Sequence, residues 1–92
     1  MYHIVLAANA EWGASIPNAS GRTVTIESAR GMVCWNLEGL GRQGCNGPGG
    51  NESGAGGLIQ RNRGGRTWFS ADDRTKAFRD NEGYFEFDAR VR

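Results

Sequence analysis

The stretch Tyr84-Phe85-Glu86-Phe87-Asp88-Ala89-Arg90-Val91 decides the fold class of this chain. Apolar and polar side chains alternate along it with a period of two, which is the period of a strand with one buried face. The pattern therefore predicts a strand that places Phe85 and Phe87 in the core. Tyr84 and Glu86 should then face water.

The same alternation recurs along the chain, and helical periodicity is almost absent. Arg22 to Glu27 alternates with Val24 and Ile26 directed inward. Further strand candidates are short, rich in β-branched and aromatic residues, and bounded by turn residues: Met1 to Ala8, Met32 to Trp35, Gly57 to Gln60 and Thr67 to Ala71. We expect one all-β domain over residues 1–92, a small antiparallel β-sandwich.

Size and charge exclude several classes of function. A chain of 92 residues holds one small domain, and its formal net charge of +1 creates no field that would recruit nucleic acid or an anionic membrane. The longest apolar run, Ile4 to Ala8, is too short for membrane insertion and lacks the flanks of a signal peptide. If the natural protein starts at Met1, we expect a product that is cytoplasmic as synthesised and that any export follows a non-classical route.

The two cysteines, Cys34 and Cys45, lack the CxxC spacing of a zinc site. Cys34 lies in an apolar run, and no secretory signal precedes it. These features favour a small buried thiol at Cys34 over a Cys34–Cys45 disulfide.

The stretch from Glu38 to Gly65 holds most of the glycines and little to bury. It predicts one long loop, then a short strand and a turn at Arg63 to Arg66. Gly39 to Gly44 fits the GxGxxG pattern, but the residues that follow cannot open the helix that a dinucleotide site needs. Arg61 to Arg66, with Trp68 behind it, resembles an RGG segment beside a stacking ring, and the near-neutral charge favours a hairpin turn with solvated arginines.

Catalytic residues are scarce, and we expect no enzymatic activity. His3 is the only histidine, and no motif pairs a nucleophile with a base. Asp72 to Gly83 clusters oxygen ligands of the kind that Ca²⁺ prefers. From residue chemistry alone, a solvated loop whose basic side chains neutralise the acids is the favoured interpretation of this segment.

Three stretches resemble the Ca²⁺-dependent galactose-binding lectins of the LecA type and their related lectin-like sandwiches. They are Val5 to Trp12 followed by Gly21 to Trp35, Gly47 to Gly50 followed by Gly57 to Ile59, and Asp80 to Phe87. The resemblance implies a galactose-binding-like sandwich with a calcium site. The region between Ile59 and Phe69 is shorter than in the family, so we expect fewer strands.

The resemblance also implies a set of site residues. The ion would be held by Asp73, Asp80, Asn81 and the backbone carbonyls of Trp35 and Ala77. The sugar would be contacted by Asn51, Glu52, Asp73, Asp80 and Asn81, with Trp35 or Trp68 packing on its apolar face. The family's ligand is a galactoside. Its sugar-contacting His and Gln have no counterparts here, so the resemblance does not imply a preference for galactose in this chain.

Two functions follow from these observations. The first is a calcium-dependent carbohydrate-binding protein, in which sugar hydroxyls replace water on the bound ion. The alternative is a non-catalytic structural or protein-binding β-sandwich with an empty or purely structural ion site. With three Trp and four Phe in so short a chain, we also expect exposed rings that favour a homo-oligomer.

Overall fold

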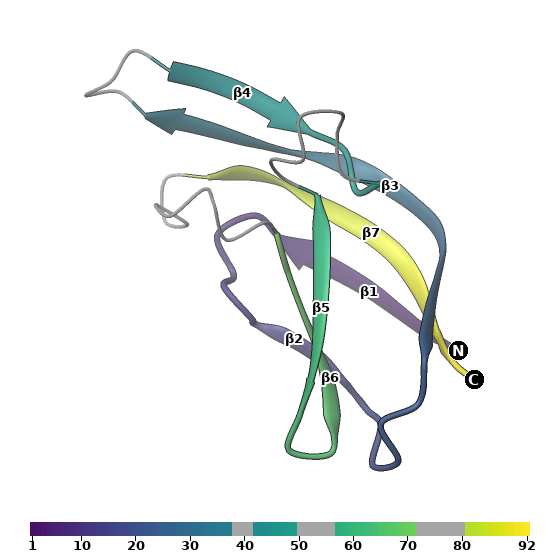
Figure 1. Ribbon diagram of the computed structural model, residues 1–92. Coiled ribbons are helices and arrows are strands. Elements are labelled where there is room, and N and C mark those ends of the chain that lie inside the picture. The colour runs from purple at the N-terminus through teal and green to yellow at the C-terminus, as the bar shows by residue number, and fades with distance from the viewer. Residues whose placement is uncertain (38–41, 50–56, 72–80) are drawn as a thin grey trace.

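The structure, a computed structural model, describes residues 1–37, 42–49, 57–71 and 81–92 (Figure 1). The described residues form strands and turns and contain no helix, so none crosses a membrane as a long apolar helix. The strands are β1 (Tyr2–Ala7), β2 (Ala14–Pro17), β3 (Val24–Leu37), β4 (Arg42–Asn46), β5 (Leu58–Arg63), β6 (Arg66–Ala71) and β7 (Glu82–Val91). The all-β fold predicted from the sequence is confirmed.

The strands form two antiparallel sheets that pack together as a small sandwich. One sheet has four strands in the order β1-β7-β3-β4, and the other has three in the order β2-β6-β5. Tyr2 lies opposite Ala89, which brings the two chain ends together at one end of the molecule (Figure 1).

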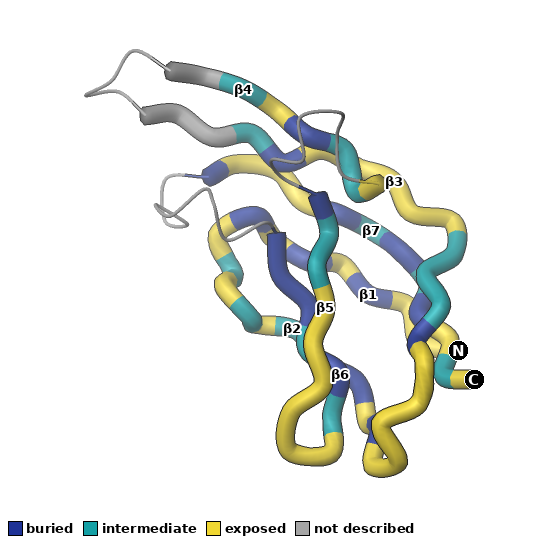
Figure 2. Tube along the Cα trace, viewed as in Figure 1, coloured by how far each residue is buried: buried dark blue, intermediate teal, exposed yellow. Residues whose placement is uncertain are grey.

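The core lies between the two sheets, where buried residues of both meet (Figure 2). Phe85 and Phe87 are fully buried, as the alternation predicts, and the ring of Phe87 meets that of Phe69 edge to face at 5.0 Å between centroids. Tyr84 is 51% exposed on the outer face. Glu86 is also on that face, but it is half-buried rather than fully exposed, because ion pairs with His3 and Arg30 cover its carboxylate.

Strand β3 runs unbroken through two segments that the sequence suggests are separate. A bulge shifts its register against β7 between Glu27 and Arg30, with Ser28 at a φ of 53°. Beyond the bulge, a Cβ on Gly31 would overlap the carbonyl oxygen of Tyr84, and one on Gly83 would overlap that of Met32. Only glycine permits this close approach of the two backbones.

The expectation of one long loop between Glu38 and the strand at Gly57 is wrong, because strand β4 lies inside that range and pairs with β3 at the edge of the sheet. The predicted strand that follows is confirmed as β5, which extends to Arg63. Gly64 and Gly65 form the turn to β6, both with positive φ, as a two-residue hairpin turn requires. Strand β2 is only four residues long and β4 has the sequence Arg-Gln-Gly-Cys-Asn, so neither shows the apolar alternation that predicts a strand.

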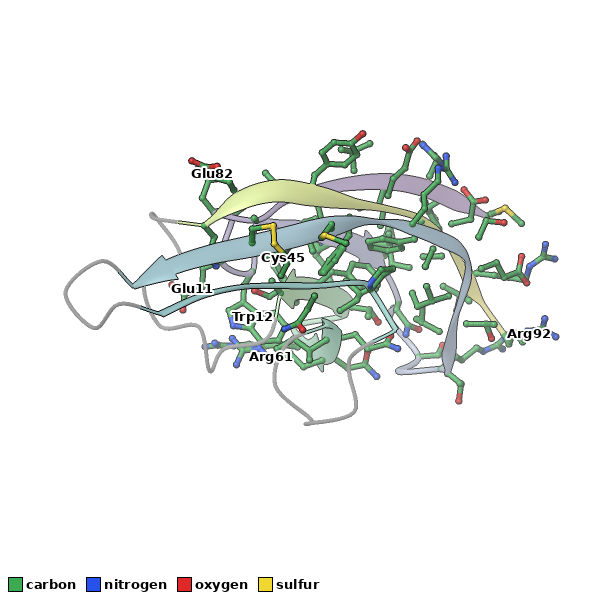
Figure 3. All side chains as sticks on the ribbon, turned by 90° about the horizontal axis from the view of Figure 1, so that it is seen from above. Glu11, Trp12, Cys45, Arg61, Glu82 and Arg92 are labelled. Carbon is green, nitrogen blue, oxygen red and sulfur yellow. A yellow bond between two sulfur atoms is a disulfide. The ribbon has the colours of Figure 1, made fainter. Side chains whose placement is uncertain are left out.

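The two cysteines form a disulfide, so the expectation of an unpaired thiol at Cys34 is also wrong. The pairing of β3 with β4 places Cys34 directly opposite Cys45. Cys34 faces outward, is only half-buried, and is not part of the core. Its sulfur is bonded to the sulfur of Cys45, which is exposed and is labelled in Figure 3.

Replacing Phe87 with Ala is expected to lower the free energy of unfolding by about 3–5 kcal/mol, because it leaves a cavity at the inter-sheet ring contact. Urea denaturation measures the change. The matched control is Tyr84→Ala on the outer face of the same strand, which should change stability by less than about 1 kcal/mol. Equal effects of the two substitutions would show that the inward face has been misassigned.

Reduction of the disulfide is expected to lower the free energy of unfolding by about 2–3 kcal/mol, since the bond closes a short loop in the unfolded chain. Thermal melts with and without dithiothreitol measure it. The double variant Cys34→Ser with Cys45→Ser should melt with the reduced protein and ignore the reductant. A melting temperature that does not change on reduction would contradict a stabilising role.

Candidate functional site

Most residues that the sequence predicts for the calcium and sugar site lie outside the described part of the chain. These are Asn51, Glu52, Asp73, Ala77 and Asp80. Trp35 lies in β3, where only its backbone is described. The structure therefore neither assembles nor separates the predicted ligand set.

Of the predicted calcium ligands, Asn81 is the one whose side chain is described. It lies just before β7 and is buried, with 6% of its surface exposed. Its Nδ2 donates a hydrogen bond to the carbonyl oxygen of Ala8 at 3.5 Å. The amide of Ala8 in turn donates to the carbonyl of Gly83 at 2.9 Å, so Asn81 is fixed where β1 ends and β7 begins. Within the described residues, no cluster of three or more acidic, His or Cys side chains is placed to bind a metal.

The described residues do form a pocket on the outer face of the three-stranded sheet. It is lined by Trp12, Arg61, Arg63, Gly64 and Trp68 and has a volume of about 340 Å³. Thr67 and Phe69 point into the core, so Trp68 between them points out. We call this cavity the Trp–Arg pocket.

Trp12 forms one wall of the Trp–Arg pocket together with Arg61. The guanidinium carbon of Arg61 lies 4.1 Å from the centre of the Trp12 ring, a cation–π contact. Figure 3 shows the two labelled residues side by side, near Glu11 and away from Arg92. Trp12 has a φ of 48°, a left-handed conformation that costs a bulky residue about 1–3 kcal/mol and that is most common at binding sites.

Trp68, the cross-strand neighbour of Arg61, and Arg63 also line the pocket. Trp68 is half-exposed, and its Nε1 donates a hydrogen bond to the carbonyl oxygen of Arg63 at 3.2 Å. This bond orients the indole and links β6 to the end of β5, next to the Gly64–Gly65 turn. The guanidinium of Arg63 forms no ion pair with any described carboxylate.

A hydrogen-bond network behind the pocket anchors the β5–β6 hairpin. Asn18 Nδ2 donates to Thr67 Oγ1 at 3.0 Å, and Thr67 Oγ1 donates to Asn62 Oδ1. Arg66 Nε donates to Ser15 Oγ at 2.8 Å, which ties the hairpin to β2. Because these contacts join three strands, the pocket is carried by a rigid sheet rather than a single loop.

A second cluster of charged groups lies on the outer face of the four-stranded sheet. His3 Nδ1 is 2.8 Å from Asp88 Oδ1, and His3 Nε2 is 2.7 Å from Glu86 Oε2. Both ring nitrogens can donate only when the imidazole is protonated. The hydrogen bond to Asp88 and then that to Glu86 therefore raise the pKa of His3 above 6.5. This cluster stabilises an edge of the sheet and faces open solvent rather than a pocket.

The sequence predicts only part of the Trp–Arg pocket. Trp68 is a predicted ring for a ligand, whereas the arginines from Arg61 to Arg66 are predicted to lie in a solvated turn. No sequence pattern indicates a role for Trp12 in binding. Its contact with Arg61 forms only when β2, β6 and β5 pair into one sheet.

Comparison with known proteins adds no family assignment. The chain matches no protein-family model, no curated protein and no solved structure.

Titration of His3 is expected to make stability depend on pH. Its pKa in the folded state lies above the unfolded value of 6.5. The stabilisation is therefore complete below pH 6.5 and is lost as the pH rises through the folded-state pKa. NMR titration of the imidazole protons should give a midpoint above 6.5, and Asp88→Asn should lower it. A midpoint at or below the unfolded value would contradict the two carboxylate contacts.

Proposed function

We propose that this protein is a non-catalytic carbohydrate-binding β-sandwich. The observation that carries the proposal is the pair of half-exposed indoles, Trp12 and Trp68, that line one small pocket. Aromatic rings offer a flat apolar surface with a polar edge, which suits the apolar face of a sugar ring. In such a pocket, a small number of polar groups is enough to fix the orientation of the ligand.

The residues of the Trp–Arg pocket divide these roles. Trp68 has an oriented, half-exposed ring that would stack on the sugar, and Arg61 and Arg63 offer N–H donors to its oxygens. The volume of about 340 Å³ lies near the lower end of ligand pockets, roughly 300 Å³. A site of this size suits one or two sugar rings.

The finer form of the proposal makes sugar binding calcium-dependent. Asp73, Asp80, Asn81 and the carbonyls of Trp35 and Ala77 would hold the ion, and Asn51 and Glu52 would contact the sugar. The support is the sequence resemblance to LecA-type lectins, together with the buried carboxamide of Asn81 at the head of β7. Carboxylate, amide and backbone oxygens are the ligands that Ca²⁺ prefers. Bound calcium would give sugar hydroxyls a cation to coordinate.

A different surface favours the second candidate, a structural or protein-binding sandwich. Val5, Met32 and Tyr84 are 59%, 55% and 51% exposed. Tyr84 lies directly opposite Met32, so an apolar strip crosses the outer face of the four-stranded sheet. This strip also supports the proposal that the chain forms a homo-oligomer, because exposed apolar patches are common at protein interfaces.

The carbohydrate proposal is tested on a glycan array run with calcium and with chelator. Wild-type protein should bind a subset of glycans, and Trp68→Ala should reduce that binding at least tenfold by removing the stacking surface. Calcium should raise the melting temperature, with a stabilisation of about 2.7 kcal/mol at 100 times its Kd. Asp80→Ala should abolish that rise.

The control is Tyr84→Ala, which removes an exposed ring from the opposite sheet and should leave glycan binding unchanged. If glycan binding depends on Trp68 but persists in chelator, the protein binds carbohydrate without calcium, and only the calcium dependence is wrong. If no glycan binds under either condition, the carbohydrate proposal fails and the protein-binding candidate takes its place.

A further inference from the structure

We infer that the Trp–Arg pocket selects acidic sugars, those that carry a carboxylate or a sulfate ester, and that Arg61 and Arg63 recognise the charge. This inference rests on the proposed carbohydrate-binding function and names the class of its ligand.

The first line of evidence is the separation of charge between the two sheets. Strands β2, β5 and β6 contain Arg61, Arg63 and Arg66 and no acidic residue. The four-stranded sheet contains the carboxylates of the described strands, which are Glu27, Glu82, Glu86 and Asp88. The outer face of the three-stranded sheet is therefore the positive face of the described structure.

The second line of evidence is that the exposed arginines of β3 and β7 pair with carboxylates, whereas within the described residues those of the pocket do not. Arg30 pairs with Glu86 at 2.9 Å, and Arg90 pairs with Glu27 at 3.4 Å. Within the described residues, neither Arg61 nor Arg63 contacts a carboxylate. Two exposed guanidinium groups that line one pocket without a counter-charge are suited to an anionic ligand.

The third line of evidence is the preorganisation of Arg61. Its guanidinium carbon lies 4.1 Å from the centre of the Trp12 ring, and the residue is exposed. A guanidinium edge binds both oxygens of a carboxylate, or two oxygens of a sulfate, through parallel hydrogen bonds. The left-handed φ of 48° at Trp12 keeps the indole in the position that this stacking requires.

Arg63 is placed to complete the anion site. The hydrogen bond from Trp68 Nε1 holds its carbonyl, so the backbone that carries its guanidinium is fixed beside the indole. A sugar ring stacked on Trp68 would lie in the pocket that both arginines line. Its acidic substituent would then meet guanidinium donors, whereas a neutral sugar would supply no counter-charge to them.

Size and charge favour an acidic sugar over single-stranded nucleic acid, which also combines rings with negative charge. Single-stranded nucleic acid binds along extended basic grooves that hold about 4–16 nucleotides in an OB-fold. The Trp–Arg pocket has a volume of about 340 Å³, and the whole chain carries a net charge of only +1.

The test compares an acidic and a neutral form of the same sugar, by calorimetry on the full chain in the presence of calcium. The first pair is trigalacturonate and its methyl ester, and the second is galactose 6-sulfate and galactose. We expect each acidic probe to bind at least tenfold more tightly than its neutral partner. Raising the salt concentration should weaken only the acidic probe.

Variants assign this preference to residues. Arg61→Gln and Arg63→Gln should each weaken trigalacturonate binding about tenfold and leave binding of the methyl ester nearly unchanged. Trp68→Ala should weaken both. The matched control is Arg92→Gln, which removes the same charge from an exposed arginine away from the pocket (Figure 3) and should have no effect.

The outcomes separate this inference from the function on which it rests. If acidic and neutral probes bind equally and Trp68→Ala weakens both, the inference is wrong and the carbohydrate function stands. If no sugar in either pair or on the glycan array binds, both are wrong. If an eight-residue oligothymidylate binds more tightly than trigalacturonate, and Arg63→Gln weakens it, the pocket is a nucleic-acid site and the inference is overturned.

Discussion

The edge-to-face contact between Phe69 and Phe87 joins the two sheets, and much of the structure depends on it. A chain of this length buries a modest fraction of its surface, so a few large rings supply much of the apolar burial. The contact also fixes which face of β6 points inward. Because side chains alternate along a strand, the burial of Phe69 requires that Trp68 point outward. The pocket is thus a consequence of the same residue pattern that forms the core.

The central position of β7 imposes a second constraint. It pairs with β1 on one side and β3 on the other, so errors in its register would expose Phe85 and Phe87 together. Gly31 and Gly83 allow the backbones of β3 and β7 to approach each other closely. The outer face of β7 adds cross-strand ion pairs, with Glu86 shared between His3 and Arg30. Such exposed pairs contribute little individually, but they satisfy the charges of this face within the sheet.

How much could be predicted from the sequence follows from these constraints. The alternation in β7 is strong because one face is buried and the other faces water, and that signal sufficed for the fold class and for the inward face. Strand β2 is only four residues long with one buried side chain, and β4 consists mainly of polar residues, so neither carries the apolar alternation that predicts a strand. The disulfide depends on the same strand, since Cys34 lies opposite Cys45 only when β4 pairs with β3. The Trp–Arg pocket contains residues from the β1–β2 connection and from the β5–β6 hairpin. No local sequence pattern predicts that two such distant segments lie together.

The two outer faces of the sandwich differ in how their charges are satisfied, and this difference has a functional consequence. On the four-stranded sheet, Arg30 and Arg90 are compensated by neighbouring carboxylates, so a ligand that bound them would first have to break existing ion pairs. On the three-stranded sheet, the guanidinium of Arg61 is held by the π-face of Trp12 instead. A ring orients the cation without neutralising it, whereas a carboxylate would do both. An arginine held in this way keeps both its charge and its hydrogen-bond donors for a partner, and the left-handed backbone of Trp12 is the conformational cost of holding it there.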